Sequence, residues 1–453
     1  MSIKLRLTVM SFFQFFVWGA WLITIANYWF GTKDWDGKQF GAVFATMGIA
    51  SLFMPTLMGI IADRWVNAEK LYCLMHLLYG ATLFYLPEVT DPQTFFYVML
   101  LAMCFYMPTL ALSNSISYTA LTNGQYDLVK AFPPIRVWGT IGFIAAMWLV
   151  NLSGNKATGY QFYIAGAASF GLSLFALSLP KCPPRNVNRE NQSWMQMLGL
   201  DAFKLFSNYK MALFFLFSMF LGGALQLTNA YGDVFLDEFK FYPKYIDSIV
   251  IQRSTIIMSI SQISETLFIL AIPFFLKRFG IKKVMLLSMF AWVLRFGLFA
   301  YGDPTTGLWM IIVSCIVYGM AFDFFNISGS LFVETSTNSQ IRSSAQGLFM
   351  MMTNGFGAVL GSLLSGWVID EYFTLAFADI SSLASYLQTN VANHSLLRFL
   401  DERGVSIVQD GAFSKAVLLK DWHHIWLAFA GYTLIIAILF ALFFKHKHER
   451  VND

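Results

Sequence analysis

The 453-residue sequence has few charged residues, and this scarcity excludes a water-soluble protein. Only 12% of the residues are charged, 57% are hydrophobic, and the mean hydropathy is +0.58. A soluble domain carries about 25% charged residues, so half that fraction leaves too little polar surface to cover a globule. Apolar runs of about 20 residues recur along the chain, each long enough to cross a bilayer as a helix. The composition predicts a polytopic helical membrane protein.

Cysteines and catalytic motifs are also scarce. The four cysteines are spaced neither as a disulfide framework nor as a zinc site. No HExxH, GxSxG or Walker-type pattern occurs, so we predict no enzyme activity, no metal and no cofactor. A membrane-embedded enzyme would need a catalytic constellation near one membrane face, and we find none. No basic cluster interleaves with aromatic residues, which argues against a nucleic-acid partner.

The apolar runs number about twelve and fall into two groups. They cover residues 7–30, 40–62, 70–87, 94–118, 132–152, 160–180, 209–230, 247–275, 282–301, 307–332, 346–369 and 424–444. Six plus six spans are expected of a transporter built from two repeated halves. We predict an N-terminal six-helix bundle over 1–180, a cytoplasmic loop over 181–206 and a C-terminal six-helix bundle over 207–453. A long outer loop is expected at about 370–423.

Lysines and arginines indicate the orientation. They precede the first span, occupy the central loop and follow the eighth span in LKRFGIKK (276–283). Because such residues mark cytoplasmic loops, we predict that both termini are cytoplasmic. The outer loop has apolar residues at roughly helical spacing, which predicts a short amphipathic helix on the outer surface, with a substrate lid as the alternative. These residues are Leu383, Leu387, Val391, Leu396, Leu397 and Leu400.

Two carboxylates are predicted near the middle of the membrane. Asp323 lies about nine residues from the inner end of its span, which places it ~14 Å deep at about 1.5 Å per residue. Glu265 lies ~15 Å deep by the same count. An ionisable group in hydrocarbon costs at least about 2.5–3.5 kcal/mol, so it normally faces the bundle interior and marks a pathway. A polar clamp between helices is the alternative.

Arginines are harder to place. In PPIRVWGTIGF (133–143), Arg136 lies only ~6 Å inside its span, where it could snorkel to the cytoplasm. An edge charge and an inward-facing functional charge therefore both fit. Arg253 and Arg295 lie nearer the predicted outer ends, where snorkelling or an outer ion pair explains them.

Polar and aromatic residues share helix faces with these charges. Arg136, Thr140 and Phe143 are spaced i, i+4 and i+7. The other sets are Gln226 with Asn229, Gln262 with Glu265, and Tyr318 with Phe322 beside Asp323. Carboxylates and amides can hold vicinal hydroxyls, and aromatic faces can hold a heterocycle or a sugar face. The sets suit a ligand that is part polyol and part flat ring, although 47 phenylalanines also create coincidental aromatic stripes.

Five strings resemble the bacterial nucleoside:proton symporters, the nucleoside permeases of the major facilitator superfamily. They are QFFVWGAWL (14–22), PTLALSNSIS (108–117), FPPIRVWGTIGF (132–143), AFDFFNISGSLFVE (321–334) and SAQGLFMMMTNGFGA (344–358). The likeness extends over almost the whole chain and weakens in the outer loop at 373–420. It implies an all-α membrane protein with twelve transmembrane helices, a cavity between the two halves, and alternating access.

The resemblance also implies proton-driven import of nucleosides such as uridine or adenosine across the bacterial cytoplasmic (inner) membrane. Protons would be the coupling ion, no cofactor would be needed, and we expect a monomer. The family's ligand-contacting positions match Arg136, Thr140, Phe143, Gln226, Asn229, Gln262, Glu265, Tyr318, Phe322 and Asp323. We hypothesise that Asp323 and Glu265 bind the ribose hydroxyls, that one of them carries the proton, and that Arg136 tunes its proton affinity.

Two alternatives remain open at the level of the sequence. A proton-linked sugar or oligosaccharide symporter of the same superfamily would use similar polyol-binding groups. A nutrient sensor without transport would need the same pocket, and only a flux measurement separates it from a transporter.

Overall fold

The computed structural model describes residues 2–126, 128–184, 200–245, 248–337, 342–402 and 404–445, which form long helices and one small sheet. The first six helices are α1 (Ile3–Gly19), α2 (Gly37–Arg64), α3 (Ala68–Tyr85), α4 (Pro92–Asn123), α5 (Leu128–Leu152) and α6 (Tyr160–Ala176). The later long helices are α8 (Tyr209–Glu238), α10 (Ser254–Tyr301), α11 (Leu308–Ser336), α13 (Ala358–Tyr372) and α16 (Trp422–Phe443).

Shorter elements complete the described chain. The short α-helices are α9 (Ile249–Gln252), α12 (Arg342–Met350), α14 (Ile380–Tyr386) and α15 (His394–Glu402), and the strands are β1 (Thr374–Asp379) and β2 (Ala412–Lys420). Two π-helices cover Asn27–Thr32 and Met351–Gly357. Short 3₁₀-helices cover Leu86–Glu88, Leu200–Ser207, Phe239–Phe241, Pro243–Tyr245 and Gln409–Gly411.

The predicted apolar runs fall on these helical segments. Within the described residues, eight helices are long and apolar enough to cross a membrane. One of them, α10, carries both the eighth and the ninth predicted runs. It is broken at Gly280, whose φ of 76° is a left-handed value that favours glycine. The eleventh run is the continuous series of α12, the second π-helix and α13.

Side-chain caps fix where several helices begin. The carboxylate of Asp36 accepts from the backbone N–H of Gln39 at 2.8 Å at the start of α2. The carboxylate of Asp91 accepts from the N–H of Thr94 at 2.7 Å at the start of α4, where Pro92 occupies the first helical position. Each cap satisfies one of the backbone donors that a helix leaves unpaired at its first turn.

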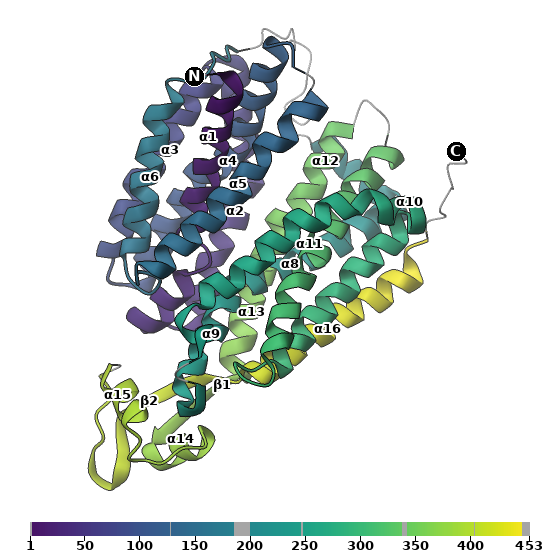
Figure 1. Ribbon diagram of the computed structural model, residues 1–453. Coiled ribbons are helices and arrows are strands. Elements are labelled where there is room, and N and C mark those ends of the chain that lie inside the picture. The colour runs from purple at the N-terminus through teal and green to yellow at the C-terminus, as the bar shows by residue number, and fades with distance from the viewer. Residues whose placement is uncertain are drawn as a thin grey trace.

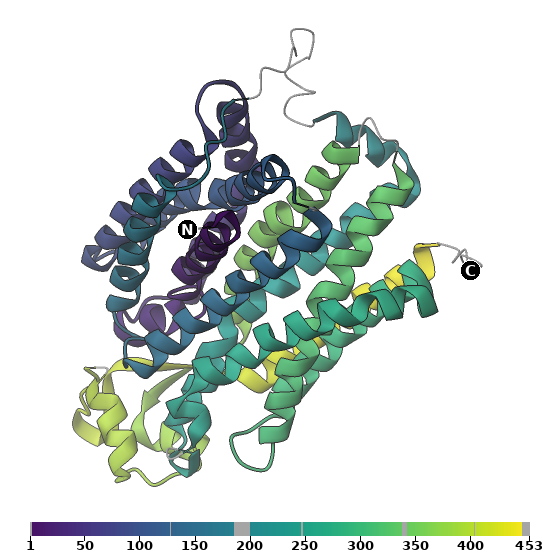
Figure 2. The same cartoon turned by 45° about the horizontal axis from the view of Figure 1, so that its top comes forward.

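The helices form two groups that lie side by side (Figure 1). One group is α1–α6, in purple to blue, and the other runs from α8 to α16, in teal to yellow. The start of α1 and the end of α16 both lie far from the small sheet, and the turned view in Figure 2 shows the same. We call the end that carries β1 and β2 the sheet end. The boundaries predicted at 181–206 stay a prediction, since residues 185–199 lie outside the described part.

The outer segment differs from its prediction. Instead of one amphipathic helix, it contains α14 and α15 together with two strands, and β1 pairs antiparallel with β2. The apolar side chains of its helices bury against the sheet in a cluster of their own, and the ring of Phe241 lies 4.2 Å from that of Phe399. Val391 and Leu397 are instead exposed. The helical spacing was real, but sheet packing accounts for it better than a membrane surface does.

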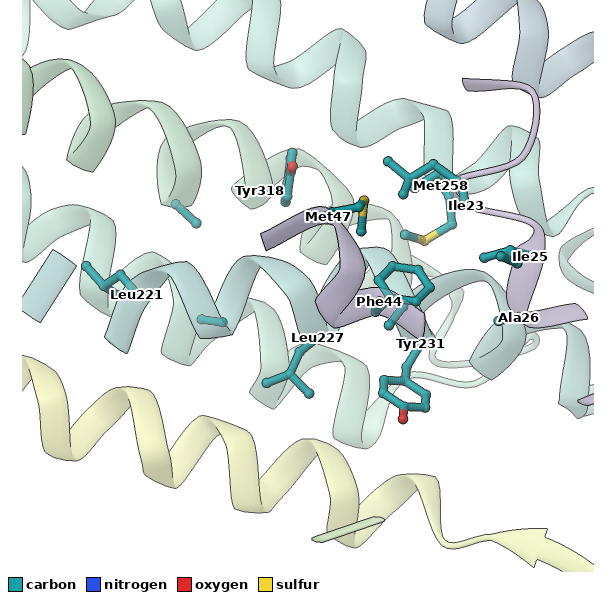
Figure 3. Packing of buried hydrophobic residues seen from close by; sticks show 14 of the residues in the cluster. Ile23, Ile25, Ala26, Phe44, Met47, Leu221, Leu227, Tyr231, Met258 and Tyr318 are labelled. Atoms are coloured by element: carbon teal, nitrogen blue, oxygen red, sulfur yellow. The ribbon is translucent and has the colours of Figure 1, made fainter. Parts of the chain in front are cut away.

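Apolar residues of both groups pack together toward the sheet end (Figure 3). Ile23 and Phe44 belong to the first group, whereas Tyr231 and Met258 belong to the second. The rings of Phe40 and Tyr231 lie 5.6 Å apart at 72°. This contact brings α8 against α2, on the sheet side of the cavity described next.

Candidate functional site

A cavity lies between the two groups of helices, lined by α1, α5, α8, α10 and α11. Its volume is about 660 Å³ including its open mouth. Its lining residues are Phe15, Trp18, Leu22, Arg136, Thr140, Phe143, Leu225, Asn229, Gln262, Glu265, Tyr318 and Phe322. They combine one cation, one carboxylate, amides, a hydroxyl and aromatic rings.

The structure brings eight of the ten predicted site residues to this lining and leaves two behind it. The two outside the lining are Gln226 and Asp323, which are 8% and 4% exposed. Gln226 lies one helical turn from Asn229 on α8, and Asp323 is adjacent to Phe322 on α11. Both lie on helices that line the cavity.

Close packing of α5 against α1 positions Arg136, Thr140 and Phe143. A Cβ at Gly142 would collide with the backbone of Phe12, so only glycine permits this approach of the two helices. The Arg136 guanidinium lies 4.0 Å above the ring of Phe15, a cation–π contact. Arg136 therefore lies along the wall of the cavity.

A second close approach, between α10 and α11, positions the acidic side of the cavity. A Cβ at Gly319 would lie 2.6 Å from the carbonyl carbon of Ser264, so the two backbones touch there. The Ser264 hydroxyl also donates to the carbonyl of Ile316. Glu265 follows Ser264 on α10, and Tyr318 precedes Gly319 on α11. The close approach of the two helices therefore holds these side chains beside one another.

Aromatic rings form another part of the wall. The rings of Tyr318 and Phe322 are nearly parallel, at 8°, with centroids 5.9 Å apart. On the opposite side, the ring of Trp18 meets that of Phe143 edge-on at 6.3 Å. Flat, parallel faces of this kind can bind a planar heterocycle.

Several polar atoms at the site lack hydrogen-bond partners. They are Gln226 Oε1, Gln262 Oε1, Asp323 Oδ2 and Trp18 Nε1, all buried. A buried polar atom without a partner costs about 1–3 kcal/mol. Arg136 is close enough for its charge to act on both Glu265 and Asp323. The cavity therefore has hydrogen-bonding capacity available for a polar ligand, next to one arginine and two carboxyl groups.

Three residues of the first predicted span that line the cavity were not predicted to do so. Phe15, Trp18 and Leu22 are spaced i, i+3 and i+7 on one face of the first span. That spacing lies within the string QFFVWGAWL and could have identified them. With 47 phenylalanines in the chain, aromatic spacing alone does not distinguish a cavity wall from ordinary helix packing.

The prediction for Arg295 is wrong. Its side chain is fully buried and does not snorkel. The guanidinium donates to the carbonyl of Ser314 at 2.7 Å and lies 4.7 Å above the ring of Tyr318 and 4.9 Å above that of Phe299. Arg295 thus supports the back of a cavity-lining ring. The i, i+4 pair that it forms with Phe299 was the available signal.

The described residues include no group of three or more His, Cys, Asp or Glu side chains arranged to hold a metal ion.

Comparison with known proteins identifies the family. The family model of the nucleoside H⁺ symporters matches residues 1–396. The nucleoside permease NupG of Escherichia coli is 49% identical, with 100% of this chain and 98% of NupG covered. The xanthosine permease of E. coli is 50% identical, with 99% and 97% covered.

Solved structures of other proteins support the same family and fold. A crystal structure of a mutant of the nucleoside transporter NupG is 48% identical, with a TM-score of 0.86, covering 98% of this chain and 100% of that one. A bacterial homologue of the human lysosomal transporter Spinster, 13% identical, has a TM-score of 0.66 over 97% and 96% of the two chains, and this likeness concerns the fold alone. The fold is that of the major facilitator superfamily. The chain belongs to the nucleoside H⁺ symporter family and is a transporter, not an enzyme, that imports nucleosides together with protons.

Proposed function

We propose that the cavity is the nucleoside site, with polar side chains around the ribose and aromatic rings around the base. The polar part of the cavity lining includes Glu265, Gln262 and Asn229, whose side chains can form hydrogen bonds with ribose hydroxyls. Tyr318 and Phe322 offer parallel faces to the base, and Phe143 lies on the α5 side. The observation that carries this proposal is the meeting of polyol-binding groups and flat aromatic faces in one cavity.

Proton coupling is assigned to the carboxylates. Asp323 is the better placed proton carrier, because it is buried behind the lining and one of its oxygens has no hydrogen-bond donor. Glu265 is the better placed ribose ligand, because it reaches the cavity surface. Arg136 acts electrostatically on both groups, so its movement between conformations would change how readily a proton is held. Linkage then requires the proton state that favours nucleoside binding to be favoured by the nucleoside in turn.

The orientation follows from the basic loops. We place both termini in the cytoplasm and the sheet end outside, in the inner membrane of a bacterium, with a monomer as the transporting unit. Among the described residues, hydrogen bonds and ion pairs between the two helix groups gather at the sheet end, including the hydrogen bond from Trp148 Nε1 to Ser259 Oγ at 2.9 Å. This conformation therefore corresponds to a site closed toward the outside.

The substrates are proposed to include uridine and adenosine. Relatives of nearly equal identity are a nucleoside permease and a xanthosine permease. Xanthosine therefore belongs in any panel of competitors. Disaccharides should not compete, because the parallel Tyr318 and Phe322 rings suit a planar base and a disaccharide has none.

The test is uptake of labelled uridine into vesicles with an imposed pH gradient, acid outside. Asp323→Asn should abolish accumulation above equilibrium while retaining exchange of uridine, and Glu265→Gln should raise the concentration needed for half-maximal uptake. Asp401→Asn, which changes an exposed carboxylate on α15, is the matched control and should behave like the parent. If both cavity variants concentrate uridine like the parent, the assignment of the carboxylates is wrong.

A further inference from the structure

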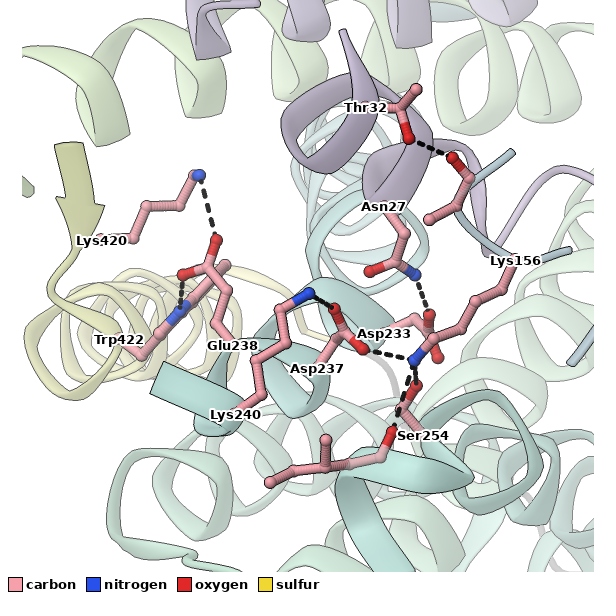
Figure 4. A network of polar contacts seen from close by, with 12 residues as sticks. Asn27, Thr32, Lys156, Asp233, Asp237, Glu238, Lys240, Ser254, Lys420 and Trp422 are labelled. Atoms are coloured by element: carbon pink, nitrogen blue, oxygen red, sulfur yellow. Dashed lines mark hydrogen bonds and ion pairs between the residues drawn. The ribbon is translucent and has the colours of Figure 1, made fainter. Parts of the chain in front are cut away.

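A cluster of charged side chains joins the two helix groups at the sheet end (Figure 4). Lys156, in the turn between α5 and α6, pairs with Asp237 on α8. Its ammonium also donates to Ser254 Oγ at 3.0 Å and to the carbonyl of Ile251 at 3.4 Å. One lysine of the first group thus makes three contacts with the second group, all of them with different elements.

The cation is well suited to this position. Burial lowers the pKa of Lys156, but the carboxylates of Asp237 and Asp233 outweigh that effect, so its pKa lies above its usual value. Lys156 therefore stays charged at every physiological pH. Its side chain is 17% exposed and that of Asp237 is 9% exposed, so water screens the ion pair only weakly.

A second contact between the groups lies beside the first. The Asn27 amide donates to one oxygen of Asp233, which is 1% exposed, while the other oxygen has no partner. The carboxylate of Asp237 also binds a lysine of its own helix group, because its second oxygen accepts a hydrogen bond from Lys240 at 2.7 Å. The second group therefore presents two buried carboxylates to one lysine and one amide of the first.

The outer segment, which belongs to the second helix group, also contacts the first group. Lys420, at the end of β2, lies 3.6 Å above the ring of Phe30 in the first helix group. The same ammonium lies 3.5 Å from Glu238, which also accepts from Trp422 Nε1 at 2.7 Å. The small sheet is thereby attached to the same cluster.

Two other ion pairs between the groups are much more exposed. Lys415 pairs with Asp34 at 2.7 Å, and their side chains are 49% and 50% exposed. Lys38 pairs with Glu371 at 3.1 Å, with similar exposure. Exposed ion pairs contribute little, whereas removing one partner of a buried pair leaves an uncompensated charge. The chain thus provides a buried pair and an exposed pair with the same chemistry at the same end.

We propose that the Lys156–Asp237 ion pair is a latch that holds the sheet end closed and must separate before the nucleoside site can face the outside. Lys156 is a positioning residue, since it lies in the α5–α6 turn and outside the cavity lining. The proposal rests on the transport function and orientation proposed above. It assigns to the turn between α5 and α6 a role in the transport cycle.

The test measures the separation of the two groups directly. Spin labels are placed at Tyr160 and Trp309, both exposed, after replacement of the four native cysteines, and distances are recorded in lipid nanodiscs. Lys156→Gln should raise the long-distance population roughly tenfold, equivalent to about 1.4 kcal/mol. Lys415→Gln, the matched control, should leave the distribution unchanged.

Two further variants keep the test interpretable if Lys156→Gln does not fold. Lys156→Arg retains the charge and should keep the parent distribution, and the exchange Lys156→Asp with Asp237→Lys should restore it in part. A parental distribution in Lys156→Gln, or an equal shift in Lys415→Gln, overturns the latch. If Lys156→Gln does not fold, a shifted distribution in Lys156→Arg overturns it and a parental one supports it. No nucleoside or proton gradient is needed, so failure here is distinct from failure of the site assignment.

Discussion

The guanidinium of Arg136 lies 4.0 Å above the ring of Phe15 while its charge acts on Glu265 and Asp323. Depth in the membrane allowed both an edge charge and an inward-facing charge, because a long side chain can snorkel from that position. The neighbours decide between them. They come from α1, α10 and α11, which the local sequence around position 136 does not specify.

Replacing Arg136 by Lys should lower uridine uptake at least about tenfold. Lysine keeps the positive charge but lacks the planar guanidinium that lies over the Phe15 ring and offers several donors at once. Initial uptake rates under a fixed proton gradient measure the effect. Arg278→Lys, at an exposed position near the inner end of the eighth span, is the control with unchanged uptake. An Arg136→Lys protein that transports normally would show that Arg136 is an ordinary edge charge.

Phe322→Ala should weaken nucleoside binding and leave coupling intact. Loss of one stacked ring costs about 1–3 kcal/mol, so the Kd should rise between about fivefold and 150-fold. Equilibrium binding of labelled uridine to purified protein checks the affinity, and uptake at saturating uridine checks the gradient dependence. Phe274→Ala, at an exposed position of α10 outside the cavity lining, should change neither. Lost gradient dependence at normal affinity would contradict the assignment.

At the scale of elements, two glycines allow the helices to approach closely enough to form the site. Gly142 faces the backbone of Phe12, and Gly319 faces that of Ser264. Neither needs a left-handed conformation, so the constraint is space for the neighbouring helix. Sequence alone could not assign a partner helix to either glycine, because many glycines in these spans would serve equally well for packing.

Gly319→Ala should destabilise the protein by about 1–3 kcal/mol, since the added methyl group forces α10 and α11 apart. The thermal unfolding midpoint in detergent should fall, and uridine affinity should fall with it because Glu265 and Tyr318 move. Gly297→Ala is the comparison, because a Cβ there meets no atom within 4 Å. It should be neutral or slightly stabilising, as alanine favours the helix. Equal midpoints for the two variants would refute the packing argument.

The elements themselves were largely predictable. Long apolar runs on their own indicate membrane helices, and the charged turn around Gly280 separates two predicted runs at the point where α10 is broken. The strands β1 and β2 were not predicted. They pair across more than 30 intervening residues, so no short hairpin turn marks them in the sequence. Their register depends on a small core that includes Phe241, far away in sequence.

At the scale of the whole molecule, the cavity and the sheet-end cluster both lie between the two helix groups. Eight of the predicted site residues lie in one cavity lining. The depth of a residue in the membrane and the helix face that it occupies together constrain where its side chain can point. The cluster of Lys156, Asp233 and Asp237 was not predicted. These residues lie near span ends, where charges are common, and only the closed arrangement of the two groups makes them neighbours.

The central claim is that this cavity couples nucleoside import to protons, and one flux experiment tests it most directly. Reconstituted protein should accumulate labelled uridine above equilibrium when the outside is more acidic than the inside. Adenosine should compete, a disaccharide should not, and a proton uncoupler should reduce uptake to equilibration. Accumulation that persists unchanged with the uncoupler, or the absence of any uridine flux, would contradict the account.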